Sequence, residues 1–222
     1  MNVKITKEDH ERLCKSKFLE YQFGSRLFGT HTEDSDYDYM RVYDFYTVFN
    51  EPDFYLPNIH SFQYDDEENN AQYLWLTYRQ FYQNLYSGDG TMQSDVVLFS
   101  GVWEKEDALR LCRTYKIIKA YCGVAKRDLK LHNNPKKIFH ADRSLYIAHC
   151  LMENFIPDLK VIQNMMEDIA EPTKLMDYEK TLRQAASRMY ENKLLDGYNI
   201  PPARDPLLNK MLEANNIREF KY

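Results

Sequence analysis

The chain of 222 residues contains little glycine, little proline and few cysteines, and each shortage excludes a class of protein. With 7 Gly and 8 Pro, neither a collagen-like nor a disordered low-complexity chain fits the composition. No two of the cysteines, Cys14, Cys112, Cys122 and Cys150, are spaced as CxxC, so we expect buried thiols in a reducing compartment rather than zinc ligands. The remaining composition, 44% hydrophobic and 28% charged, is that of a globular protein.

Long apolar runs are also missing. No segment approaches the roughly 20 apolar residues that a membrane-spanning helix needs. Residues 1–5 lack the apolar core of a signal peptide. We therefore expect a cytoplasmic protein with no membrane partner.

Charge is divided unevenly along the chain. Residues 31–68 carry eleven Asp and Glu against one Arg, a balance of −10, whereas residues 110–143 carry ten Lys and Arg against two Asp, a balance of +8. An acidic section followed by a basic one fits a metal site that faces a phosphate-binding surface. Two solvated faces without function would give the same partition, so charge alone does not decide between them.

The pattern of apolar and turn-forming residues predicts an α/β (α+β) fold, with a small mixed-sheet core over residues 1–102 and a helical bundle over residues 103–222. In the first part we expect a helix at 6–17 and strands at 18–23, 36–48, 71–76 and 95–99. Thr77 and Gln80 have the spacing of a capping box that opens a helix, and Gly88 is placed to end it. In the second part we expect helices at 108–131, 141–155, 159–169, 178–195 and 207–214.

Two aspartates, Asp36 and Asp38, begin the strand expected at 36–48. Side chains alternate along a strand, so these two carboxylates point to the same face. Like charges side by side are unfavourable unless a cation lies between them, and carboxylate oxygens suit Mg²⁺ or Mn²⁺. The pair is therefore a candidate metal site.

A Gly-Ser bend precedes this pair, ten residues before it. Gly24 lets the backbone come close to a ligand, and the N–H groups of such a turn, together with the Ser25 hydroxyl, can hold phosphate oxygens. If the two strands lie side by side, the bend and the carboxylates meet at one end of the sheet. The combination predicts a site for a nucleoside triphosphate and its metal ion.

The segment Phe23-Gly24-Ser25, followed after ten residues by Asp36-Tyr37-Asp38-Tyr39, resembles the signature of DNA polymerase beta-like nucleotidyltransferases. The run from Gly24 to Asp38 is most similar to the bacterial and phage branch that is associated with RNA repair, and softer similarity extends over residues 20–150. The resemblance implies that Asp36 and Asp38 bind the metal, and that Gly24, Ser25 and Ser35 bind the nucleotide.

The resemblance also implies a third carboxylate on a later strand, but the strand expected at 71–76 contains no acid. The candidates elsewhere are Asp44, Asp65, Asp66, Glu67, Glu68 and Asp95, and a chain without a third acid is the remaining alternative. A solvated loop is the competing interpretation of residues 65–68.

The basic helical section supplies further candidates. The resemblance favours Lys126, Lys130 and Arg143 as nucleotide contacts, and His140 lies one helical turn before Arg143. We thus expect a metal-dependent nucleotidyltransferase that adds a nucleotidyl group to a hydroxyl, with an RNA end as the favoured acceptor. A catalytically silent nucleotide- or nucleic-acid-binding protein and a protein adenylyltransferase are the alternatives, and the oligomeric state is open.

Overall fold

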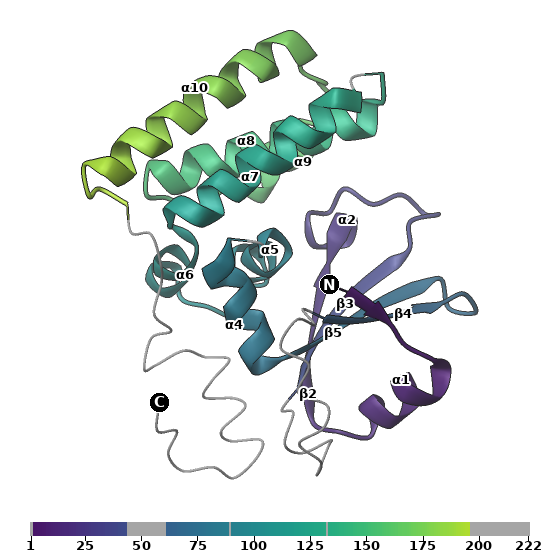
Figure 1. Ribbon diagram of the computed structural model, residues 1–222. Helices are drawn as coiled ribbons and strands as arrows, with labels where there is room; N and C mark the ends of the chain where they lie inside the picture. The colour runs from purple at the N-terminus through teal and green to yellow at the C-terminus, as the bar shows by residue number, and fades with distance from the viewer. Residues whose placement is uncertain (1, 44–60, 89, 132, 196–222) are drawn as a thin grey trace.

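The computed structural model describes residues 2–43, 61–88, 90–131 and 133–195 (Figure 1). A mixed sheet with helices comes first and a helical region follows, which confirms the expected fold class. Within the described residues, no helix combines the length and the apolar character needed to cross a bilayer.

The sheet has five strands in the order β1-β4-β5-β3-β2. Their bounds are β1 (Asn2–Lys4), β2 (Phe18–Phe23), β3 (Tyr37–Tyr43), β4 (Ser61–Asp66) and β5 (Ala71–Thr77). β3 lies antiparallel to β2 and parallel to β5, so that Asp38 is flanked by Phe23 on one side and by Gln72 on the other. The end of β2 and the start of β3 therefore meet at the same end of the sheet, as the sequence predicted.

Ten helical segments accompany the strands in the described part of the chain. They are α1 (Lys7–Cys14), α2 (Gly24–Leu27), α4 (Tyr78–Ser87), α5 (Thr91–Phe99), α6 (Lys105–Cys112), α7 (Tyr115–Asp128), the 3-10 turn η2 (Leu129–Leu131), α8 (Pro135–Met152), α9 (Leu159–Asn164) and α10 (Pro172–Glu191). Figure 1 shows α4 and α5 between the sheet and the layer that α7, α8 and α10 form above them.

Side chains alternate between the two faces of the sheet along β3, and each face packs against a different hydrophobic cluster. Met40 and Val42 point into the main hydrophobic cluster, on the side of the helical region. Tyr43 and Trp75 belong to a smaller cluster, which α1 covers on the opposite side. Because Asp38 precedes Met40 by two residues, its side chain emerges on the helical side of the sheet.

One continuous hydrophobic cluster connects the sheet with the helices. It contains Leu76 of β5, Val97 of α5, Ile118 of α7 and Leu145 of α8, each of which is almost fully buried. Burial on this scale is the main favourable term in folding. The helical region is therefore packed against the sheet rather than tethered beside it.

Local signals in the sequence explain several helix boundaries. Thr77 caps α4, since its hydroxyl accepts the Gln80 N–H while the Gln80 side chain accepts the Thr77 N–H. Gly88 ends the same helix in the left-handed conformation, with φ of 79°. These details confirm the capping box and the glycine stop expected from the sequence.

The strand expected at 95–99 is wrong, because these residues form the second half of α5. A short apolar run does not distinguish a buried strand from a buried helix, and neighbouring Val96 and Val97 are both buried. The single helix expected at 108–131 is also wrong. Arg113 leaves helical geometry with ψ of 60°, and Thr114 caps a new helix by accepting the Ile117 N–H.

The structure contains two strands that sequence periodicity did not reveal, β1 and β4. The second includes Asp65 and Asp66, for which a solvated loop was one interpretation. Residues 44–48 of the strand expected at 36–48 and the whole helix expected at 207–214 lie outside the described residues.

The buried His10 provides a test of the packing beneath the sheet. Its Nδ1 accepts a hydrogen bond from Trp75 Nε1 at 3.1 Å, and burial, with the charge of Arg41 second, lowers the pKa of the imidazole. The folded state therefore resists protonation of His10. The associated stability is complete above about pH 6.5 and is lost as the pH falls below it.

We expect the free energy of unfolding to fall between pH 7 and pH 5, by at most about 1.4 kcal/mol per pH unit from this residue. His10→Asn retains an acceptor without a titrating ring, so urea titrations across this range should show a shallower decline for the variant. An identical decline in both proteins would contradict the assignment.

Candidate functional site

The Gly-Ser bend and the two aspartates meet where β2 ends and β3 begins. Gly24 follows β2 directly and has φ of 66°, a conformation that favours glycine. A Cβ atom on Gly24 would overlap the Asp38 carboxylate, so the absence of a side chain lets the acid lie against the bend. Ser25 lies in α2, whose first turn is not capped by any side chain. The predicted juxtaposition of Gly24, Ser25 and Asp38 is therefore present.

Arg26 fastens the intervening loop to this bend. Its Nη2 donates to the Ser35 carbonyl at 2.8 Å, its Nε donates to the Asp36 carbonyl at 3.2 Å, and its guanidinium lies 3.6 Å from the centre of the Tyr37 ring. These contacts fix the backbone immediately before β3. The residue thus holds the two acids beside α2, a role that the sequence did not suggest.

Ser35 has a local partner rather than an open position. Its hydroxyl accepts the Thr32 N–H at 2.9 Å and lies 3.1 Å from the Thr32 hydroxyl. The structure accordingly places the predicted nucleotide contact Ser35 in the turn that shapes the loop, next to the exposed Asp36.

The two acids share one electrostatic environment. Asp38 is half-buried, and burial together with the negative charge of Asp36 raises its pKa to about 6. The positive charges of Lys136 and Arg26 act in the opposite direction but do not cancel the effect. A cation between the carboxylates would relieve this repulsion, so the pair has the character expected of a metal site.

Lys136 brings the helical region to the site. It lies in the first turn of α8, where the Asn134 side chain accepts the Lys137 N–H and Pro135 occupies the first helical position. A helix N-terminus carries partial positive charge, and Lys136 adds a full one. The site therefore combines a carboxylate pair with a positively charged wall that is suited to phosphate.

An amide, Gln72, and not a carboxylate lies beside Asp38 on β5. The Gln72 Nε2 donates to Asp65 on β4 at 2.9 Å. Asp65 is two strand spacings from β3, about 10 Å, and it pairs with Lys4 at 2.7 Å. The pKa of Asp65 is lowered, mainly by the hydrogen bond from Lys4.

The other acidic candidates have different partners. Asp66 accepts hydrogen bonds from Asn69, Glu68 pairs with Lys7 at 3.5 Å, and Glu67 is exposed. Asp44 lies outside the described residues. Among the residues that are described, no group of three His, Cys, Asp or Glu side chains is arranged to hold a metal ion.

Asp95 and Arg143 interact with residues other than the Gly-Ser bend and the two aspartates. Tyr121 donates to Asp95 at 2.5 Å, and burial raises the pKa of Asp95 to about 6 despite the nearby charge of Arg143. The Arg143 guanidinium lies 4.1 Å from the centre of the Phe28 ring, and its buried Nε has no hydrogen-bond partner in the described structure. Arg143, predicted as a nucleotide contact, thus packs against the residue that follows α2.

A second basic group surrounds Asp128, whose side chain is only 3% exposed. Arg127 Nε lies 3.0 Å from the carboxylate and Lys137 Nζ lies 3.7 Å from it. Burial and the charge of Arg143 lower the pKa of His140 to about 4, so its ring is neutral near pH 7 and its contact with Asp128 is not an ion pair. Among the predicted lysines, Lys126 and Lys130 are exposed, and neither contributes to the environment of Asp38.

Sequence reasoning missed Arg26, Lys136 and the position of Gln72. Arg26 directly follows the Gly-Ser bend, and Lys136 follows Pro135, a residue favoured at helix N-termini, so weak local signals for both were present. The electrostatic effect of Lys136 on Asp38 depends on where α8 lies in the tertiary structure and has no local signal.

Comparison of the chain with known protein families, characterised proteins and solved structures finds no match.

The fit of Asp38 against the bend can be tested at Gly24. Gly24→Ala introduces both a strained positive φ, which costs about 1–2 kcal/mol, and an overlap with the Asp38 carboxylate. Gly101 is a matched control, since it has φ of 72° and open space where a Cβ would lie. In urea denaturation, we expect Gly24→Ala to lose more stability than Gly101→Ala. Equal losses of stability in the two variants would mean that Asp38 does not contact the Gly24 backbone closely.

The electrostatic coupling can be measured by NMR titration of the Asp38 carboxyl carbon. Asp36→Asn should lower the pKa of Asp38 from about 6, and Lys136→Ala should raise it further. Lys137→Ala is the control, because Lys137 faces Asp128 instead. A pKa of Asp38 that is insensitive to both Asp36 and Lys136 would refute the arrangement.

Proposed function

We propose that this protein is a metal-dependent nucleotidyltransferase that transfers a nucleotidyl group from a nucleoside triphosphate to a hydroxyl acceptor, with an RNA end as the favoured acceptor. The observation that carries the proposal is the contact of Asp38 with the Gly24 bend, within the electrostatic influence of Asp36 and Lys136. The Gly24 bend and Lys136 would bind the phosphates of a nucleoside triphosphate, and the two aspartates would bind its metal ion.

The donor set fits Mg²⁺ or Mn²⁺. Mg²⁺ commonly binds through one or two carboxylates together with substrate phosphates and water, so two acids can suffice to hold it. Asp36 and Asp38 would be these ligands. When bound, the ion neutralises charge that develops on the phosphate oxygens.

The chain's own residues would position the reactants. The backbone at Gly24 and Ser25 binds the outer phosphates, while Lys136 and the α8 N-terminus offset their charge. The acceptor oxygen forms a bond to the α-phosphorus, the bond to the β-phosphate oxygen breaks, and pyrophosphate leaves with the electron pair. The hydroxyl proton passes to solvent. Positioning and electrostatic stabilisation account for most of the rate enhancement in such transfers.

The test is transfer of radiolabelled nucleotide to RNA in the presence of Mg²⁺ or Mn²⁺. We expect Asp36→Ala and Asp38→Ala each to reduce transfer by about 100-fold or more, because each removes a ligand for the charge-stabilising ion. Asp34→Ala is the matched control, an exposed acid in the same loop, and it should transfer at close to the wild-type rate. Transfer that survives both ligand substitutions would end the proposal.

Gln72 favours a second candidate function, a nucleotide-binding protein without turnover. An amide occupies the position beside Asp38 where the expected third acid would stand. Saturable nucleotide binding that requires Asp36 and Asp38, together with no labelled product on any acceptor, would support this candidate over the transferase.

A further inference from the structure

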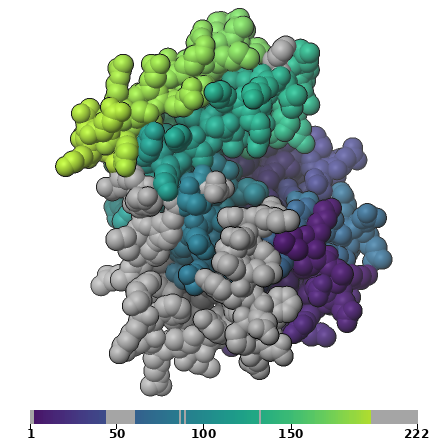
Figure 2. Space-filling model, viewed as in Figure 1, coloured from purple at the N-terminus to yellow at the C-terminus, as the bar shows by residue number. Residues whose placement is uncertain are grey.

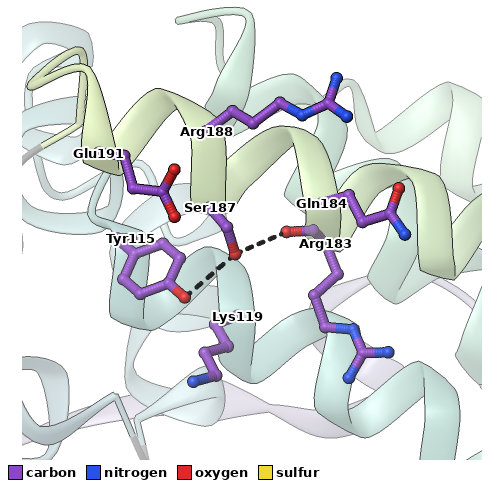
Figure 3. A pocket seen from close by; sticks show the side chains of 7 residues that line it. All are labelled: Tyr115, Lys119, Arg183, Gln184, Ser187, Arg188 and Glu191. Atoms are coloured by element: carbon purple, nitrogen blue, oxygen red, sulfur yellow. Dashed lines mark hydrogen bonds between the residues drawn. The ribbon is translucent and has the colours of Figure 1, made fainter.

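A groove lies between the start of α7 and the last turns of α10 (Figure 3). The first turn of α8, which contains Lys136, lies beside the other end of α7, where Lys137 contacts Asp128. Its volume is about 520 Å³, and its lining is polar. The Tyr115 and Ser187 hydroxyls lie 3.3 Å apart across the groove, and Ser187 Oγ also donates to the Arg183 carbonyl at 3.1 Å. The Tyr115–Ser187 hydrogen bond joins α7 to α10, so the packing of these two helices determines the shape of the groove.

Basic side chains dominate this groove. Lys119, Arg183 and Arg188 line it, against a single acid, Glu191. Figure 3 shows Lys119 and Arg183 extending below α10 on the side of α7. Arg183 keeps an internal partner, Glu179, at 3.2 Å, whereas Lys119 lies 5.6 Å from the centre of the Tyr115 ring. The groove is therefore suited to an anion.

An aromatic pair borders the same groove. The rings of Tyr115 and Tyr190 are stacked, with centroids 4.5 Å apart and planes inclined by 8°. Tyr190 is 43% exposed, so part of its side chain remains accessible at the helix surface. Stacking on such rings is the usual way in which proteins bind unpaired bases without sequence preference.

Exposed lysines continue from the groove along α7. Lys119, Lys126 and Lys130 are separated by seven and four residues, which places them on one side of the helical path through α7 and η2. With a rise of about 1.5 Å per residue, the row is roughly 16 Å long. Within the described residues, none of the three forms an ion pair.

No side chain of the described residues covers the middle of this row of lysines. Gly123 lies between Lys119 and Lys126, it is exposed, and a Cβ placed on it would meet no atom within 4 Å. Like charges along one helix face repel each other and gain stability from an external polyanion. Beyond Lys130 the chain turns into α8, where the charge of Lys136 acts on Asp38. The row thus leads from the groove towards the carboxylate pair, along helices that contribute side chains to the face shown in Figure 2.

We propose that a single strand of nucleic acid binds along α7, with a base stacked on the Tyr115–Tyr190 pair and with backbone phosphates at Lys119, Lys126 and Lys130. This inference deepens the proposed function, since it places the acceptor strand so that its end approaches Asp36 and Asp38. It also gives Lys126 and Lys130 a partner other than the nucleoside triphosphate.

Strand binding can be measured separately from catalysis. The full chain carrying Asp36→Ala and Asp38→Ala is titrated without divalent metal into a fluorescein-labelled RNA of about 12 nucleotides, a length in the range that single-strand-binding surfaces cover. Binding is followed by anisotropy over a series of salt concentrations. Because each phosphate contact contributes about −0.7 to the slope of log affinity against log salt, the combined Lys119→Ala, Lys126→Ala and Lys130→Ala variant should have a slope shallower by about 2.

The aromatic pair gives a second readout. Tyr190→Ala should weaken binding by roughly 5- to 100-fold, because a base loses its stacking surface, and should leave the salt slope nearly unchanged. Lys7→Ala on α1, which pairs with Glu68 on the other side of the sheet, is the control and should bind as the parent does. A DNA of the same sequence reports whether the strand must be RNA, and both results support a single-strand site.

Several outcomes would overturn the inference. The first is an unchanged affinity and salt slope in the triple lysine variant, and the second is equal binding of duplex and single-stranded RNA. The third is equal competition by polyglutamate together with no effect of Tyr190→Ala, a result that would indicate a surface for any polyanion. Strand binding that depends on the lysines and Tyr190, combined with no nucleotide transfer by the wild-type protein, would sustain this inference and reject the proposed function.

Discussion

The close approach of the Gly24 backbone to the Asp38 carboxylate is the constraint on which the site depends. Only a residue without a side chain can occupy this bend, because a Cβ would overlap the acid and because the backbone has a positive φ. The contact needs β2 and β3 to be neighbours in register, with Phe23 opposite Asp38. Strand pairing, a glycine and an acid at one end of the sheet are thus parts of a single arrangement.

That arrangement brings acids together at an energetic disadvantage, which nearby cations only partly offset. Asp38 has a raised pKa because it is half-buried beside Asp36, even though Arg26 and Lys136 are close enough to oppose the shift. A fold has little reason to retain such a pair for stability alone. Unfavourable electrostatics that a ligand would relieve are typical of functional sites, which is why the geometry supports a role in binding a metal and a polyanion.

The sequence predicted the parts of this site that lie close together along the chain. The Gly-Ser bend, the spaced aspartates, the strand at 18–23 and the capping box at Thr77 are each encoded within a few residues, and the structure has them where they were expected. The acidic candidates for the third position were not separable by sequence, because their partners, such as Lys4 for Asp65 and Tyr121 for Asp95, come from distant segments.

Errors arose where packing overrides a local pattern. The apolar run at 95–99 reads equally as strand or helix, and its position between the sheet and α7 decides for the helix. Lys136 and Arg143 show the same limit at the level of function. The charge of Lys136 acts on Asp38, whereas Arg143 packs on Phe28, although both belong to the same helix and the same basic section.

The continuous hydrophobic cluster limits how far the helical region can move relative to the sheet. Leu76 of the sheet and Leu145 of α8 belong to one buried interior, so the wall that carries Lys136 cannot swing away without exposing apolar surface to water. Opening of two lobes about a hinge is therefore costly in this architecture. A ligand that binds at the Gly24 bend would therefore meet a site that is already formed, around which only exposed side chains can rotate.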